Sequence, residues 1–196
     1  MSRQVVNWEY LIARQRQLND ALVASGLFDE DIATITYPPA PESEIVAAEE
    51  RLGVHLDPHY RELLQITNGW RHLYRWQNLL PAGDLGADIH NDNVIQSWHA
   101  VEEGHRAFWT SGGDPANDPD GYPGYQRLLP IGVKDPGIGG LLVIAAIPAT
   151  EPAPTTPGVV FDTADDPLVT YPNLAAYIQA RSDDDYQLLQ THGISI

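Results

Sequence analysis

The chain has 196 residues, 43% of them hydrophobic, and a formal net charge of −16 at pH 7. The length fits a single domain, and the field around so acidic a chain repels nucleic acid and anionic membranes. Because the sequence contains no cysteine, disulfides, thiolate catalysis and cysteine-ligated zinc are excluded. The acidity has two interpretations: it attracts a basic partner, or it serves solubility alone.

The charge is concentrated in the second part of the chain. Residues 77–196 hold 4 basic and 16 acidic residues, a net of −12, whereas residues 1–76 hold 7 and 11, a net of −4. The first ten residues, MSRQVVNWEY, contain no apolar signal core, and no apolar run is long enough to cross a bilayer. We therefore expect a cytoplasmic protein.

The first predicted element is a helix over residues 7–25. Its apolar residues recur at helical spacing, Asn7 is suited to cap its start, and Ser25-Gly26 to end it. We expect an N-terminal helical extension, residues 1–37, that packs against a core domain of residues 38–196. A helix that binds a partner is the alternative.

The next helix is predicted to begin at Pro41 and end at Gly53. Glu42 and Glu44 favour a first helical turn, where free amide groups attract negative charge, and Gly53 supplies a left-handed stop. The residues expected to face the core are Ile45, Ala48 and Leu52.

A brief extended link then leads to another short helix. Asp57 is placed to cap it, Pro58 suits its first position, and Asn68-Gly69 can turn out of it with positive φ. The inner stripe is expected to consist of Tyr60, Leu63, Leu64 and Thr67.

Strand signals dominate the rest of the chain. Residues 73–80 predict one strand, two apolar segments predict central strands at 127–133 and 140–147, and residues 158–163 predict another strand. Helices are predicted over 92–109 and 172–181, with a further one in 183–190. This order predicts an α+β fold in which helices pack against an antiparallel or mixed sheet.

The pattern of residues 38–69 resembles the opening of a SUKH-superfamily domain, the fold of the fungal cell-wall-synthesis regulators of the Smi/Knr type. The residues that carry the resemblance are Pro38 to Pro41, Ile45, Glu49, Leu52-Gly53, Leu56 with Pro58, Tyr60, Leu63-Leu64 and Asn68-Gly69. One departure is visible, since Asp57 separates a leucine and a proline that the family usually joins. The resemblance continues to about residue 181 and implies a single SUKH-like domain.

Metal and catalytic patterns are missing from the sequence. His90, His99 and His105 lie near acidic residues, but there is no His-x-x-x-His pair and no HExxH. The sequence gives no nucleophilic residue for which a general base can be identified. We interpret Glu49, which matches the family's helix glutamate, as a structural acid that accepts hydrogen bonds or pairs locally. The sequence thus predicts no catalytic residue, no metal and no cofactor.

The long segment 110–125 suits protein binding better than calcium binding. Its residues Asp114, Asp118 and Asp120 lack the central Gly and closing Glu of an EF-hand loop. Aromatic side chains anchor interfaces at low entropic cost. We therefore predict partner binding by these three acids together with Tyr122 and with Trp70, which we place in a loop. The alternative is an acidic loop that contacts nothing.

Three classes of function remain. By the resemblance, bacterial SUKH proteins are immunity proteins that neutralise polymorphic toxins, many of them nucleases with basic surfaces, and an acidic chain suits that role. A regulatory scaffold, as in the fungal relatives, is the alternative, and an enzyme ranks last. We predict a non-enzymatic module that binds a basic partner protein, with no nucleic-acid or membrane partner; the sequence leaves the oligomeric state open.

Overall fold

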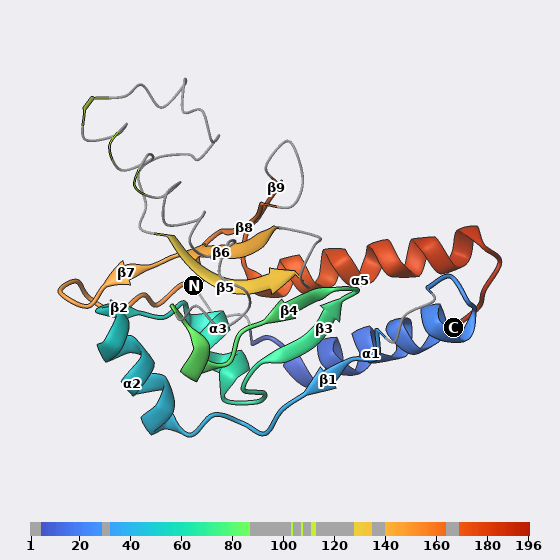
Figure 1. Cartoon of the computed structure of the whole chain (residues 1–196), viewed down its shortest axis with the longest axis horizontal. Helices are drawn as coiled ribbons and strands as arrows, with labels where there is room; N and C mark the ends of the chain where they lie inside the picture. The colour runs from blue at the N-terminus through green and yellow to red at the C-terminus, as the bar shows by residue number, and fades with distance from the viewer. Residues whose placement is uncertain are drawn as a thin grey trace.

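Helices and strands alternate irregularly along the chain, and the helices pack against one main sheet (Figure 1). The computed structural model describes residues 5–28, 32–86, 103, 107, 111–112, 128–134, 140–163 and 169–196. The helices of this part are α1 (Trp8–Ala24), α2 (Glu42–Leu52), α3 (Pro58–Leu64), the 3-10 turn η1 (Ala82–Asp84) and α5 (Leu174–Thr191). The predicted α+β class is confirmed. The helix predicted over 92–109 lies outside the described residues.

Among the described residues, seven strands form one sheet in the order β1-β3-β4-β5-β6-β8-β9, and β2 and β7 form a separate pair. Every neighbouring pair is antiparallel. The strands are β1 (Ile35–Thr36), β2 (Val54–His55), β3 (Trp70–Tyr74), β4 (Gln77–Leu79), β5 (Leu128–Lys134), β6 (Leu141–Ala145), β7 (Ile147–Pro148), β8 (Val160–Asp162) and β9 (Val169–Tyr171). The strands predicted at 127–133, 140–147 and 158–163 are thus confirmed.

The strand predicted over 73–80 is wrong, because the chain turns back within it. Residues 70–74 and 77–79 form the hairpin β3–β4, and the turn between them begins at Arg75, whose φ is 51°. A non-glycine residue with positive φ gives no turn signal in the sequence. The strand also begins earlier than expected, at Trp70, so this residue does not lie in a loop.

The caps of α2 and α3 follow the sequence closely. Gly53 ends α2 in the left-handed region with a φ of 64°. Asp57 caps α3 by accepting hydrogen bonds from the backbone amides of His59 at 2.9 Å and Tyr60 at 3.1 Å. The other carboxylate oxygen accepts one from Gly158 at 2.6 Å, so the extra acid between the leucine and the proline also ties α3 to the segment before β8.

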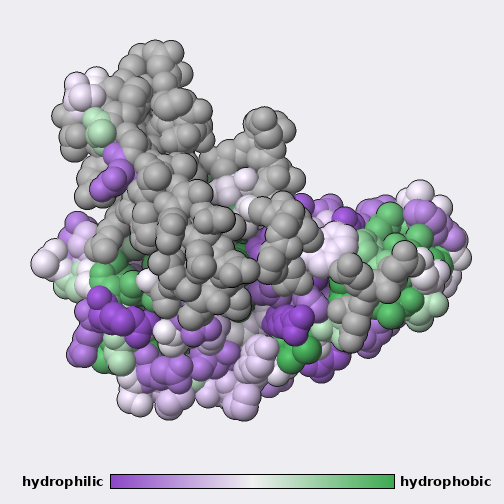
Figure 2. Space-filling model, viewed as in Figure 1, coloured by the Kyte–Doolittle hydropathy of each residue, from purple (hydrophilic) through white to green (hydrophobic). Residues whose placement is uncertain are grey.

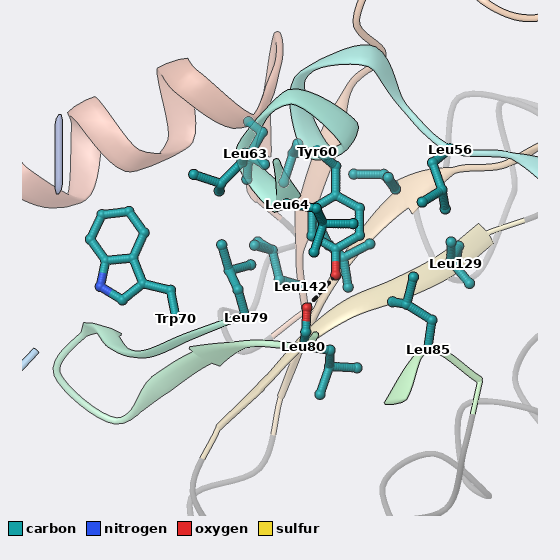
Figure 3. Close-up of a cluster of buried hydrophobic side chains, with 14 of the residues drawn as sticks. Leu56, Tyr60, Leu63, Leu64, Trp70, Leu79, Leu80, Leu85, Leu129 and Leu142 are labelled. Carbon is teal, nitrogen blue, oxygen red and sulfur yellow. Dashed lines mark hydrogen bonds between the residues drawn. The ribbon is translucent and has the colours of Figure 1, made fainter. Parts of the chain in front are cut away.

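One apolar core joins α2 and α3 to the sheet (Figure 3). The predicted inner residues Ile45, Tyr60, Leu63 and Leu64 are all buried, and Leu52 is half-buried against the same core. The Tyr60 hydroxyl donates a hydrogen bond of 2.5 Å to the carbonyl oxygen of Leu80, which satisfies the one polar atom of that side chain.

Helices α1 and α5 lie side by side and extend past the sheet, away from α2 (Figure 1). We call α1 together with residues 181–191 of α5 the helical arm. A small second core closes its far end, where Figure 2 shows hydrophobic residues gathered on the surface. The buried residues of this core are Leu18, Leu22, Ile32 and Leu189. None of the described helices is long and apolar enough to cross a membrane.

The two terminal helices predicted over 172–181 and 183–190 are one continuous helix, α5. The acidic run at 183–185 does not break it, because other elements satisfy two of its carboxylates. Asp183 pairs with Arg14 at 2.6 Å, and Asp185 accepts hydrogen bonds from Gln15 at 2.9 Å and Arg75 at 3.1 Å.

Candidate functional site: a groove beside the Asn-Gly turn

A groove of about 810 Å³ opens between the proline-rich segment before α2 and the segment that joins β4 to η1. Tyr37, Pro38 and Pro39 form one wall, residues 78–81 form the other, and Arg71 of β3 lies within the lining. Aromatic and proline side chains lose little conformational entropy when they make a contact, so they suit the binding of another protein chain.

Asn68 holds the base of this groove. Its side-chain nitrogen Nδ2 donates a hydrogen bond to Glu44 Oε1 at 2.9 Å, and its side-chain oxygen Oδ1 accepts one from the backbone amide of Ala82 at 2.8 Å. Its backbone amide donates to the carbonyl oxygen of Pro38 at 3.1 Å. One residue therefore fixes the start of α2, the start of η1 and the proline wall in relation to one another.

Gly69 completes the turn for two physical reasons. Its φ of 96° is one that side chains rarely adopt. A Cβ at this position would also lie 3.2 Å from the backbone nitrogen of Pro81, a tight contact that a larger residue could make only if the Pro81 backbone shifted. The Asn-Gly pair of the sequence motif is therefore what brings the two walls close together.

Both walls are anchored by backbone groups. On the proline side, the amide of Tyr37 donates to Thr67 Oγ1 at 3.0 Å. Thr67 is buried, as predicted, but it lies beyond the end of α3 and not within the helix. On the other side, Arg51 donates to the carbonyl oxygens of Ala82 at 3.0 Å and Leu85 at 3.2 Å. Walls held in this way are preorganised, which lowers the entropic cost of binding.

The charges of the groove are sparse. Glu44 is half-buried and accepts the Asn68 hydrogen bond, and Asp84 is half-exposed. Arg71 is exposed, and no hydrogen bond or ion pair to it is seen within the described part of the chain. Beneath the groove, burial raises the pKa of Tyr60, and the charge of Asp84 adds to this shift, so the phenol stays neutral as a hydrogen-bond donor.

Of the predicted partner-binding residues, the structure describes only Trp70. This residue begins strand β3, so the loop expected there is wrong. The indole is completely buried in the core beneath β3, as Figure 3 shows, so Trp70 has no surface with which to contact a partner. Asp114, Asp118, Asp120 and Tyr122 lie outside the described residues. The exposed aromatic of the groove is Tyr37, which the sequence analysis missed although it directly precedes Pro38-Pro39.

The described residues offer no metal-binding cluster. Among them, no three histidine or acidic side chains gather as they would around a metal ion, and His90, His99 and His105 fall outside this part. Glu49 is confirmed as a structural acid, because it accepts the backbone amide of Leu56 at 2.9 Å and lies 3.6 Å from Arg61.

Asp57 is also a structural acid, although its environment could be mistaken for an active site. Burial raises the pKa of Asp57, and three backbone amides oppose this shift by stabilising the carboxylate. These amides belong to His59, Tyr60 and Gly158. Because both of its oxygens are engaged with the backbone, Asp57 fixes the local fold and is not positioned to exchange a proton with a substrate.

Comparison with known families gives one result. The model of the SMI1 / KNR4 family (SUKH-1) matches residues 39–180, which span α2, α3, the strands from β2 to β9 and the first part of α5. The match includes most of the groove and excludes α1. No curated protein matches the chain.

Proposed function

Because the chain belongs to the SMI1/KNR4 (SUKH-1) family, we propose that it is a non-enzymatic protein-binding module, an immunity protein that neutralises a polymorphic toxin. The partner we propose is a basic protein, with a toxin nuclease as the leading candidate, met in the cytoplasm. The observation that carries this proposal is the distribution of charge over the chain.

The cations of the described part are mostly engaged within the protein. Arg61 contacts Glu42, Arg75 contacts Asp185, and Arg181 contacts Asp162 at 2.8 Å. Exposed acids such as Glu9, Asp20 and Glu50 have no such partner among the described residues. These exposed acids, in a chain whose net charge is −16, speed encounter with a basic surface.

We assign the two steps of binding to different parts of the chain. Asp114, Asp118 and Asp120 contribute to the field that attracts the partner, which is screened beyond about 8 Å at physiological salt. The groove, with Tyr37 as its exposed aromatic, anchors the bound partner in the role first expected for Trp70. Tyr122 adds a second aromatic anchor beside the acidic residues.

The first experiment is neutralisation. The chain is co-expressed with the toxin-like protein encoded beside its gene, and growth of the host and formation of a complex are measured. Rescue of growth together with a stable complex supports an immunity function. If no such neighbour exists and affinity capture returns a partner without toxicity, a regulatory scaffold of the Smi/Knr type is the function instead.

The second experiment tests the acidic field with that partner. Changing Asp114, Asp118 and Asp120 together to Asn should slow association and reduce its dependence on salt. The matched control changes Glu9→Gln, Asp20→Asn and Glu50→Gln, which removes the same charge from exposed sites elsewhere. Equal effects of the two triple variants would show that only net charge matters and that these three aspartates form no recognition field.

The third experiment tests the anchor. Changing Tyr37→Ala should leave association nearly unchanged and speed dissociation, since the contact forms after encounter. Tyr10→Ala, an exposed tyrosine on α1, is the control. Dissociation rates that are equal in the two variants would remove the groove from the interface.

A further inference from the structure

Arg71 differs from the other arginines that the structure describes. Each of the others is held by a partner within the chain, whereas no hydrogen bond or ion pair is seen for Arg71 among the described residues. The held arginines and their partners are Arg14 with Asp183, Arg16 with Thr36, Arg51 with Ala82 and Leu85, Arg61 with Glu42, Arg75 with Asp185, and Arg181 with Asp162.

The position of Arg71 is fixed by the sheet. It follows Trp70 in β3, and because strand side chains alternate, the burial of Trp70 directs Arg71 to the opposite, exposed face. In the register of the sheet it stands opposite Ile35 of β1, which is 41% exposed. The guanidinium group thus lines the groove from a rigid element and not from a loop.

The acids near Arg71 do not neutralise it. Glu44 accepts the amide of Asn68, and neither Glu44 nor Asp84 forms an ion pair with Arg71, although all three line the same groove. A chain with a net charge of −16 has a large excess of carboxylates that could pair with this arginine. Within the described part of the chain, none of these carboxylates pairs with the guanidinium group, which lines the groove where a bound segment would lie.

We propose that Arg71 recognises a carboxylate, the side chain of an aspartate or glutamate in an extended segment of the partner. A guanidinium group presents a planar set of donors that matches a carboxylate with two parallel hydrogen bonds. Apolar side chains next to that acid pack against Tyr37 and Pro39. Strand β1 stands first in the order of the described strands, so an extended segment at this edge can also pair with its backbone.

The basic partner protein is part of the proposed function, on which this inference rests. A contact to one carboxylate is compatible with such a partner. The net charges act over long range and set the rate of encounter, whereas one charge pair inside the groove acts at contact and selects the segment and its register. Of the many acidic segments that a basic protein exposes, only one with apolar neighbours fits between the walls.

The test uses a library of displayed 12-residue peptides, selected against the purified full-length chain. For the wild-type chain we expect enrichment of Asp or Glu next to apolar residues. For Arg71→Glu we expect Lys or Arg at the same position instead, and the peptides selected with wild type should bind Arg71→Ala about 10- to 100-fold more weakly. Arg14→Glu, which makes the same change in net charge and whose partner Asp183 does not line the groove, is the control and should select as wild type does.

The outcomes separate this inference from the proposed function. Absence of acidic enrichment, absence of any selected peptide, or the same preference in Arg71→Glu as in wild type would overturn the role of Arg71. A toxin that binds Arg71→Glu as tightly as wild type would also overturn it and leave the immunity function standing. A chain that captures no toxin but shows the charge reversal would retain the carboxylate site and lose the immunity function.

Discussion

The region that matches the family and the helical arm are stabilised by different kinds of interaction. In the matched region, apolar side chains of α2, α3 and the sheet fill one continuous core. In the arm, buried polar side chains connect α1, α5 and the β3–β4 hairpin: Gln15, Asn19, Ser182 and Asp185. Apolar contact tolerates small shifts between elements, whereas hydrogen bonds between buried groups fix one arrangement.

This difference shows what each region contributes. The matched region supplies the groove and its rigid walls. The arm adds stability from outside the family match, through Trp8, Leu11 and Ile12 in the main core and through Asn19. Asn19 donates hydrogen bonds to the carbonyl oxygens of Ile32 at 3.2 Å and His72 at 2.8 Å. Because His72 follows Arg71 in β3, Asn19 holds this strand beside the groove. We therefore propose that residues 1–37, expected as an extension, fold together with residues 38–196.

The largest effect is expected in the apolar core of the matched region. Leu64→Ala should lower the free energy of unfolding by about 2–5 kcal/mol, since it leaves a cavity among packed side chains. Val46→Ala, at an exposed position of α2, should change it by less than about 0.5 kcal/mol. Urea denaturation of both variants measures the difference. Similar losses in the two would mean that burial is not what stabilises this region.

A smaller effect is expected in the polar network of the arm. Asn19→Ala removes a donor to the buried carbonyl oxygens of Ile32 and His72, of which the second keeps the hydroxyl of Thr34, and should cost about 1–3 kcal/mol. Gln17→Ala, on the exposed side of the same helix, is the control. If the two variants unfold at the same urea concentration, the network does not hold the arm, and the contrast between the two regions fails.

The same contrast explains what could be predicted from the sequence. The caps of α2 and α3 depend on neighbouring residues, so Gly53 and Asp57 were identified correctly. Helical periodicity also gave the buried residues of both helices, and continuous apolar runs gave the central strands. Strand β9, which has three residues, was missed because its side chains are only partly buried and show no apolar run.

The remaining errors come from interactions between residues distant in sequence. The turn at Arg75 needs a positive φ, and its side chain pairs with Asp185, 110 positions away. The continuous α5 depends on partners in α1 and in the β3–β4 turn for its acidic run. The groove arises where Asn68 joins three segments, and no local pattern marks Arg71 as the arginine without a partner among the described residues.

The smallest effect, and the sharpest test of the arm, concerns the charge of Asp185. Burial raises the pKa of Asp185 above its usual value of 3.8, Gln15 and Arg75 oppose this shift, and Asp184 adds to it. The folded chain therefore binds a proton at this site more tightly than the unfolded chain. The contribution of Asp185 to stability should increase as the pH falls from neutrality through the raised pKa toward 3.8.

Asp185→Asn removes this titration and keeps the shape of the side chain. We expect a small gain of stability at pH 7, because the cost of burying the charge, which outweighs the Arg75 ion pair where the pKa is raised, disappears together with that pair. Wild type should then gain stability relative to the variant between pH 7 and pH 4.5. Urea denaturation of both chains at the two pH values measures this change, and the titration of every other group cancels in the comparison. A change in the opposite direction would mean that Arg75 and Gln15 outweigh burial and hold the pKa of Asp185 below its usual value.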